Sequence, residues 1–175
     1  MSTTGRIAIL LEEGFDDDEL EQILSQIKST GIESVLVAPV GNRRYTGRWQ
    51  RTSFTSNTTA GTLAAADLAA VIVPGGYAPD RLRMRHPLLD LVRHAITAGI
   101  PVGAIGHGAQ VLISAGAVAG RTMTCWPSIA LDVKNAGGLY VDRPVAEDRG
   151  IITARKTDDV APFIDAVLAA IRRRH

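Results

Sequence analysis

The sequence has a single cysteine, Cys125, among its 175 residues. One cysteine excludes an internal disulfide and a zinc site built on cysteine ligands. The chain has 19 Lys and Arg residues and 18 Asp and Glu residues, so positive and negative charges are nearly balanced. A dedicated nucleic-acid-binding protein would show a strong basic excess, so this balance argues against that class. We therefore predict a protein without a bound metal or other cofactor and without a nucleic-acid partner.

Long hydrophobic runs, internal repeats and low-complexity segments are also absent. The apolar run at 7–11 is followed at once by Glu12 and Glu13, which makes it too short for a signal peptide or a membrane span. We expect a cytoplasmic protein that does not contact a membrane. Hydrophobic residues make up 46% of the chain, enough for an ordinary core, and the length fits one domain over residues 1–175.

Short apolar runs alternate with helical patterns along the chain. We predict strands at 6–11, 33–39, 68–73, 100–105, 122–125, 139–141 and 150–154, and helices at 16–28, 81–98, 109–115, 127–135 and 159–174. This alternation predicts an α/β fold, a three-layer sandwich with a mainly parallel central sheet and helices on both faces. Ligands of such sheets bind beyond the carboxyl ends of the strands, so the loops after residues 11, 73 and 105 are the candidate sites.

The polar segment 41–62 interrupts this alternation and carries Tyr45, Trp49 and Phe54. These aromatic side chains need a surface to pack on, so the segment is predicted to form a hairpin or another extended excursion rather than a linker. Aromatic rings interleaved with basic residues also suit nucleic-acid binding, and the basic residues here are Arg43, Arg44, Arg48 and Arg51. The net charge of +1 favours a solvated hairpin at a subunit interface instead.

The loop after residue 105 has the sequence pattern of a nucleophile elbow. A buried strand passes through one residue, Gly106, directly into a helix. Glycine adopts positive φ at little cost, so the turn can persist without Ser or Cys at its apex. His107 follows, and Gly108 is expected to leave the surroundings of that histidine open. The spacing by itself favours a plain strand–helix turn, because a Gly-His-Gly string is a weak signal of a catalytic site.

The other two loops carry glycines and carboxylates. Gly75 and Gly76 let backbone N–H groups approach a ligand or an oxyanion. Asp80 precedes a predicted helix, where it would also fit an N-cap. The segment 12–19 has six carboxylates in eight residues. Most of them must be solvated or serve a helix N-terminus, and one could be buried with a raised pKa suited to acid–base chemistry. The pattern leaves open which one that is.

Together these motifs resemble the DJ-1/PfpI superfamily, in its PfpI-like branch, over nearly the whole chain. The elbow of that family reads Ala-Ile-Cys-His-Gly-Pro-Gln, and residues 104–110 read Ala-Ile-Gly-His-Gly-Ala-Gln. Further matching segments are Gly14-Phe15-Asp16-Asp17, Pro74-Gly75-Gly76 with Ala78-Pro79-Asp80, Leu112 to Gly116, Trp126-Pro127-Ser128-Ile129 and Thr153-Ala154-Arg155. The resemblance implies a flavodoxin-like fold, also described as class I glutamine amidotransferase-like.

The resemblance also assigns roles to the site residues. The family's nucleophilic cysteine falls on Gly106, its histidine on His107, and the acid that hydrogen-bonds the cysteine on Asp16. A second acid falls on Asp80, and in PfpI-like oligomers it reaches the histidine of a neighbouring subunit. The resemblance thus implies a homodimer or a higher homo-oligomer. The substrate-binding residues that it implies are Trp126, Gly75, Gly76, Gly106 and Gly108.

Because Gly106 has no side chain, the resemblance does not extend to the thiol chemistry of a cysteine peptidase or a glyoxalase. Cys125 is expected to be a buried and inert thiol. One remaining function is a cysteine-independent hydratase, lyase or isomerase, in which Asp16, His107 and Asp80 perform general acid–base chemistry on a small polar molecule. Another is a non-catalytic binding or regulatory protein. A third is an engineered cysteine-to-glycine variant of a thiol-dependent enzyme.

Overall fold

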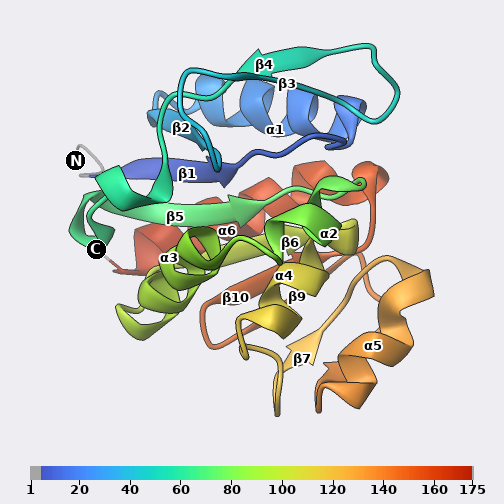
Figure 1. Ribbon diagram of the computed structural model, residues 1–175. Helices are drawn as coiled ribbons and strands as arrows, with labels where there is room; N and C mark the ends of the chain where they lie inside the picture. The colour runs from blue at the N-terminus through green and yellow to red at the C-terminus, as the bar shows by residue number, and fades with distance from the viewer. Residues whose placement is uncertain (1–4, 175) are drawn as a thin grey trace.

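A six-stranded sheet forms the centre of the protein (Figure 1). The computed structural model describes residues 5–174, and its strand order is β2-β1-β5-β6-β10-β9. Five strands are parallel, and only β9 pairs in the antiparallel direction, with β10. The strands are β1 (Arg6–Leu10), β2 (Ser34–Val37), β5 (Leu68–Val73), β6 (Val102–Ile105), β9 (Val145–Asp148) and β10 (Ile151–Ala154). The predicted α/β fold with a mainly parallel sheet is confirmed.

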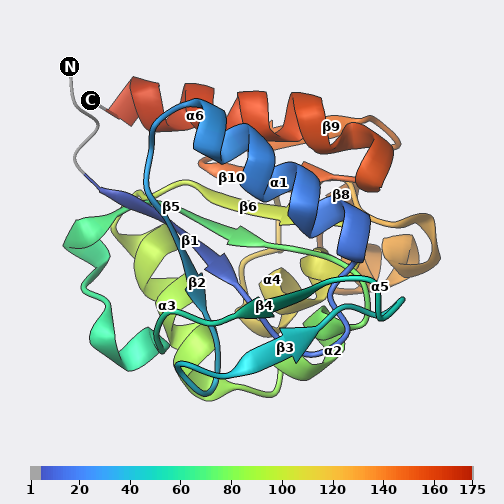
Figure 2. The same ribbon diagram turned by 90° about the horizontal axis from the view of Figure 1, so that it is seen from above.

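Helices cover both faces of this sheet (Figure 2). Helices α1 (Asp17–Ser29) and α6 (Val160–Arg174) lie side by side on one face, and α3 (His86–Thr97) and α4 (Ala109–Ser114) lie on the other. The chain runs from β1 outward to β2 and then returns past β1 to β5. Such a reversal of strand order opens a crevice at the carboxyl ends of the strands.

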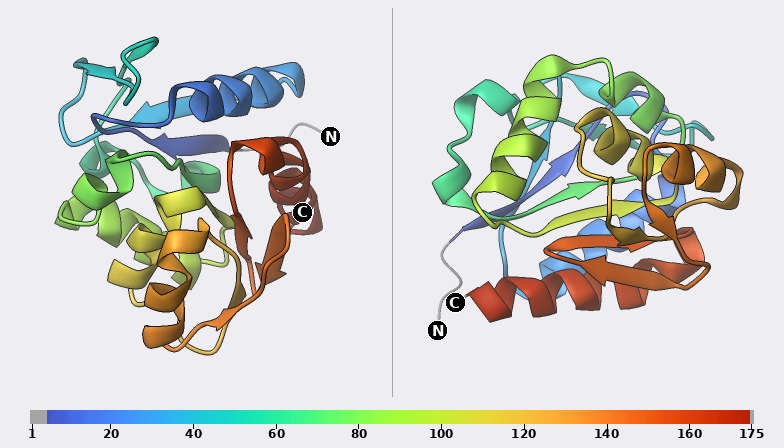
Figure 3. Two further views of the ribbon diagram at one scale, coloured as in Figure 1. Left: turned by 90° about the vertical axis from the view of Figure 1, so that its right-hand side faces the viewer. Right: turned by 90° about the horizontal axis from the view of Figure 1, so that it is seen from below.

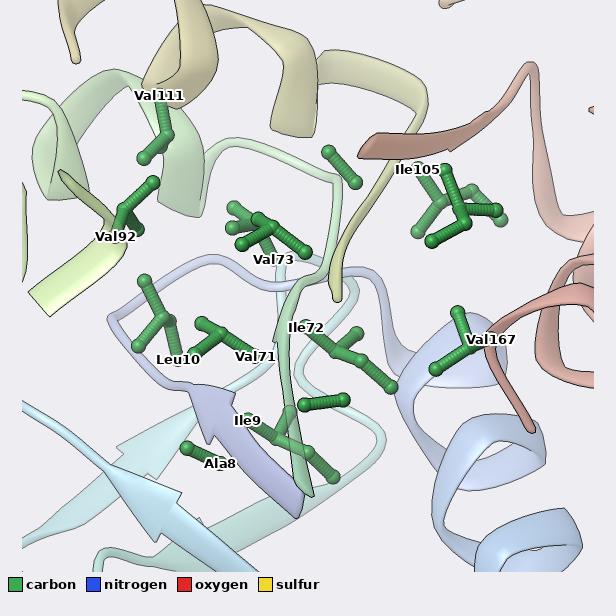
Figure 4. Close-up of a cluster of buried hydrophobic side chains, with 14 of the residues drawn as sticks. Ala8, Ile9, Leu10, Val71, Ile72, Val73, Val92, Ile105, Val111 and Val167 are labelled. Atoms are coloured by element: carbon green, nitrogen blue, oxygen red, sulfur yellow. The ribbon is translucent and has the colours of Figure 1, made fainter. Parts of the chain in front are cut away.

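The core lies between the sheet and its two helical layers. Every residue of β5 is buried, as expected for a parallel strand that is covered on both faces. Figure 4 shows the side chains of Ile9 and Ile72 among those of the strands, with Val92 and Val111 from one helical layer and Val167 from the other. This two-sided packing fixes the ends of the strands, from which the site loops leave.

The prediction of one continuous helix at 81–98 is wrong, because the structure has two helices in this region. Helix α2 spans Ala78–Leu82, and α3 begins at His86 with Pro87 in its first turn. A proline ring is tolerated in the first turn of a helix but not in its interior, so the helical pattern must restart at this point. Asp80 lies inside α2, and Tyr77 takes the N-cap position. The expectation that Asp80 is an N-cap is therefore also wrong.

Two smaller units flank the sheet. Strands β3 (Arg44–Thr46) and β4 (Ser53–Thr55) pair antiparallel, so the hairpin predicted within 41–62 is confirmed. Strands β7 (Thr122–Met123) and β8 (Leu139–Tyr140), together with α5 (Ala130–Asn135), form an outer unit next to β9 (Figure 3). Strand β9 itself was not predicted. Among the helices of residues 5–174, none combines the length and the apolar character that crossing a bilayer requires.

Candidate functional site

A pocket of about 120 Å³ opens at the carboxyl ends of the strands. The loops after β1, β5, β6 and β10 all contribute to its walls, as the topology of the sheet requires. Two further side chains come from the tip of the β3–β4 hairpin and from the loop before α5. The lining residues are Asp16, Glu19, Arg48, Gly76, Gly106, His107, Trp126, Lys156 and Thr157. Five residues selected from the sequence therefore meet here, namely Asp16, Gly76, Gly106, His107 and Trp126.

Gly106 forms the apex of the elbow and has a φ of 60°. A Cβ atom built on Gly106 would lie 3.6 Å from the carbonyl oxygen of Arg155 and 3.9 Å from Oε2 of Glu19, which are ordinary contacts. The space above the apex is thus open to a ligand. Gly108 differs, because a Cβ atom there would lie 2.5 Å from the carbonyl oxygen of Val73. Gly108 is required for close packing, so the expectation that it keeps the site open is wrong.

Glu19 is the carboxyl group beside the apex. It is 3% exposed, and its Oε1 accepts the backbone N–H of Gly75 at 2.5 Å. The pKa of Glu19 is raised to about 8: burial is the main cause and the charge of Asp16 adds to it, against the opposing effects of the Gly75 N–H and the Arg48 guanidinium. At neutral pH this side chain therefore carries a proton, which it can donate to a ligand.

Sequence reasoning did not select Glu19, although a signal was present. Asp16 is the N-cap of α1, and its Oδ1 accepts the N–H of Glu19 at 3.1 Å. An acid three residues after a capping residue is typical of a capping box, in which it would bond back to the N-cap N–H. Here the side chain of Glu19 bonds to Gly75 instead. A residue that looked structural thus faces the pocket.

Asp16 has a different environment from the one expected. Its Oδ2 pairs with Nη2 of Arg48 at 2.7 Å, and the side chain is only 8% exposed. No atom of Asp16 is among those within 4 Å of a Cβ atom on Gly106, whereas Glu19 is. The assignment of Asp16 as the acid next to the elbow position is therefore corrected to Glu19. Asp16 serves as an N-cap and as the anion that pairs with Arg48.

His107 lies beside an aromatic ring and a hydroxyl group in the pocket. Its imidazole stacks on Trp126 with 6.1 Å between the ring centroids, and its Nε2 is 3.4 Å from Oγ of Ser128. Burial lowers the pKa of His107, and the positive charge of Arg48 lowers it further. A neutral imidazole at physiological pH can accept a proton. His107 is thus placed to act as a base.

The pocket lining does not include Gly75, Gly108 or Asp80, which were selected from the sequence, nor does it include Cys125. The N–H of Gly75 is used by Glu19, so it is not available to a ligand. Asp80 is exposed on α2, and its contact with a neighbouring subunit stays a prediction. Cys125 is fully buried, so its expected burial is confirmed, and burial, together with the charge of Asp132, raises its pKa to about 12, which disfavours the reactive thiolate. Within residues 5–174, no three His, Cys, Asp or Glu side chains are grouped as metal ligands.

Arg48 reaches the pocket because the tip of the hairpin is fixed to α1. The carboxylate of Asp17 accepts the backbone N–H groups of Trp49, Arg51 and Thr52 at 2.9, 3.0 and 2.9 Å. Burial alone would raise the pKa of Asp17, but these three donors, helped by the Thr52 hydroxyl, lower it. An ionised carboxylate therefore clamps the hairpin tip. The sequence placed Arg48 in a solvated hairpin, and its position in the pocket was not anticipated.

Comparison with known proteins agrees with this architecture. The profile of the DJ-1/PfpI family matches residues 5–170. An uncharacterized protein of Archaeoglobus fulgidus is 37% identical over 173 residues, which cover 96% of this chain and 99% of that protein. Protein/nucleic acid deglycase 2 of Escherichia coli is 32% identical over 159 residues, 90% of this chain and 92% of its own length. A similar crystal structure is that of a two-domain protein from Anabaena variabilis, which contains DJ-1/ThiJ/PfpI-like and ferritin-like domains. It has a TM-score of 0.92 and is 33% identical, and the match covers 94% of this chain and 47% of that one. The chain belongs to the DJ-1/PfpI family.

Proposed function

We propose that the protein is a cysteine-independent enzyme that performs general acid–base chemistry on a small carbonyl compound. The observation that carries the proposal is the carboxyl group of Glu19, buried beside the open apex of the elbow with a pKa of about 8. A group with a pKa near the working pH can both give and take a proton efficiently. Glu19 therefore replaces Asp16 as the central acid of the sequence-based hypothesis.

The absence of a usable thiol supports this choice. Gly106 has no side chain, and Cys125 is buried with its pKa raised to about 12. The covalent chemistry that the family resemblance implies thus has no nucleophile in this pocket. The relative from Escherichia coli is named a deglycase, and we do not propose that activity for this chain.

The two titratable groups of the pocket suit opposite roles on one ligand. Glu19 donates its proton to the carbonyl oxygen, while the neutral His107 removes a proton from the adjacent carbon. Where the adjacent carbon carries a hydroxyl group, the product of this step is an enediol. The imidazolium of His107 then returns its proton to the former carbonyl carbon, while the carboxylate of Glu19 takes the proton of that hydroxyl group, which completes an isomerisation and restores both side chains. The same pair of groups would serve a hydratase or a lyase. The proposal keeps two further expectations. Asp80 of a neighbouring subunit reaches the site, and the protein is cytoplasmic.

Deuterium exchange tests this proposal. Hydroxyacetone and dihydroxyacetone are incubated with the protein in D₂O, and loss of the C–H signals is followed by proton NMR. We expect enzyme-dependent exchange that falls by about 100-fold or more in Glu19→Gln. Glu21→Gln is the matched control, because Glu21 lies on the same helix and is exposed. No exchange, or equal exchange in Glu19→Gln, would overturn the proposal.

The alternative is a non-catalytic protein that binds a metabolite. The observation in its favour is the missing side chain at Gly106, which leaves room for a ligand but provides no nucleophile. The same NMR samples separate the two functions. Line broadening of the ligand signals without any deuterium exchange would support binding alone.

A further inference from the structure

The guanidinium group of Arg48 is only partly used by the protein. Its Nη2 pairs with Oδ2 of Asp16 at 2.7 Å. Its Nε is buried and has no hydrogen-bond partner in the part of the chain that the structure describes. A buried donor on a charged group is costly to leave unpaired, and an arginine offers a planar fork of donors that matches a carboxylate. The unmet donor lies on a side chain that lines the pocket.

Arg48 is held in place before any ligand arrives. The guanidinium carbon lies 4.7 Å from the ring centroid of Trp49 and 5.5 Å from that of Tyr77. The backbone N–H of Arg48 donates to the carbonyl oxygen of Phe15 at 2.8 Å, and Asp17 fixes the residues that follow. Because the side chain and its backbone are already ordered, binding a ligand costs little additional entropy.

The balance of charge in the pocket also favours an anion. Arg48 and Lys156 are the two cationic side chains of its lining, Lys156 being paired with Asp158, and Asp16 is its one acidic side chain besides the protonated Glu19. The volume of about 120 Å³ is below the roughly 300 to 1,000 Å³ of pockets that hold drug-sized ligands, so the ligand is small. A small monoanion fits this space and charge better than a phosphorylated compound, whose second charge Asp16 would repel.

We propose that the pocket binds a small carboxylate of the 2-oxo or 2-hydroxy acid class, with its carboxylate group on Arg48 and its oxo or hydroxyl group toward Glu19. The inference rests on the proposed function for the orientation of the ligand, but the carboxylate contact is independent of it. Lys156 supplies a weaker attraction, because its side chain is 44% exposed and pairs with Asp158 at 3.1 Å.

Calorimetric titration with pyruvate and with its uncharged amide, pyruvamide, tests the carboxylate contact. We expect the wild-type protein to bind pyruvate at least about tenfold more tightly than pyruvamide, and Arg48→Gln to lose this preference. Arg44→Gln is the matched control, because Arg44 is exposed on the same hairpin and its loss changes the net charge equally. Equal binding of the two compounds by the wild type would overturn the inference, as would equal losses in the two arginine variants.

A second variant guards against loss of structure in Arg48→Gln. Asp16→Asn keeps an N-cap residue of equal quality but removes the anion that competes for Arg48. We expect this variant to bind pyruvate several-fold more tightly than the wild type, a change that damage to the fold cannot produce. Weaker binding of pyruvate by Asp16→Asn would count against the inference.

The two proposals fail separately. Deuterium exchange of hydroxyacetone without any preference for pyruvate over pyruvamide would leave the acid–base function standing and overturn the carboxylate site. A preference for pyruvate that depends on Arg48, without exchange of any tested carbonyl compound, would support the carboxylate site and overturn the catalytic role of Glu19.

Discussion

Asp17 and Glu19 lie two residues apart in the first turn of α1, and both are buried, yet the pKa of Asp17 is lowered and that of Glu19 is raised to about 8. Burial opposes ionisation in both cases, so it does not explain the difference. Asp17 receives three backbone N–H groups and the hydroxyl group of Thr52. Glu19 receives one N–H group, from Gly75, and lies near the negative charge of Asp16.

The number of donors therefore explains why the pKa values of the two carboxyl groups shift in opposite directions. Asp17 is fully occupied, and its contacts hold the hairpin tip that carries Arg48. Glu19 has an oxygen, Oε2, that faces the open apex instead of a protein donor. One turn of helix thus supplies both the clamp that shapes the pocket and the buried carboxyl group beside its open apex.

Replacement of Asp17 is expected to have the largest effect. Asp17→Ala leaves three backbone N–H groups at the hairpin tip without their acceptor, so we expect the free energy of unfolding to fall by about 4 kcal/mol. Urea denaturation followed by circular dichroism measures this loss. A loss below about 1 kcal/mol would show that water replaces the carboxylate and that Asp17 is no clamp.

The next largest effect is expected in the pH dependence of stability, to which Asp17 and Glu19 contribute with opposite signs. Between pH 4.5 and 8 the unfolded chain loses the proton of Glu19 while the folded protein keeps it, so Glu19 lowers the free energy of unfolding as pH rises. Asp17 acts oppositely, because its stabilisation is present above its ordinary pKa of 3.8 and is lost as pH falls further.

Glu19→Gln removes the decrease in the free energy of unfolding that Glu19 causes as pH rises. Relative to the wild type, this variant is expected to gain roughly 2 to 3 kcal/mol in stability between pH 5 and pH 7, at about 1.4 kcal/mol for each pH unit. Denaturant titrations at several pH values measure the difference. A constant difference across this range would mean that Glu19 ionises normally in the folded protein. Asp17→Asn is the control, because its difference from the wild type should change only below about pH 4.

The sheet and the position of the pocket could be predicted from the sequence. The continuous apolar runs of β1, β5 and β6 are distinctive, and parallel strands place their following loops at one edge. The break between α2 and α3 was also accessible, since Pro87 marks the start of a new helix. The motifs around Gly106 were sufficient to indicate the family.

The chemistry inside the pocket could not be predicted in the same way. Glu19 occupies a position at which a capping box explains an acid equally well, and only the fold brings Gly75 to it. Arg48 enters the pocket through contacts between Asp17 and residues more than 30 positions away in the sequence. Local patterns do not contain such long-range contacts, so neither the protonated carboxyl nor the arginine was identified.

Introducing a thiol beside Glu19 is expected to have a smaller effect on stability. The contacts of a new Cβ atom in Gly106→Cys are ordinary, but the φ of 60° disfavours any side chain by about 1 to 2 kcal/mol. The protonated Glu19 would donate to the thiolate and lower its pKa below the usual value of about 8.5. Alkylation rates measured against pH by mass spectrometry test this, with Cys125 unmodified in the native wild type as the control. A midpoint above 8.5 would show that Glu19 does not donate at the apex.

The smallest effect is expected at Asp18, the acid between the two buried ones. Asp18 is 54% exposed, and its partner Arg51, at 2.8 Å, is 55% exposed, so solvent and salt screen the pair. Asp18→Asn should unfold at a denaturant concentration within error of the wild type, and equally at low and high salt. A clear salt-dependent loss would mean that this ion pair helps Asp17 to hold the hairpin tip. The clamp would then depend on surface charge as well as on buried donors, and the contrast between Asp17 and Glu19 would have to include their exposed neighbour.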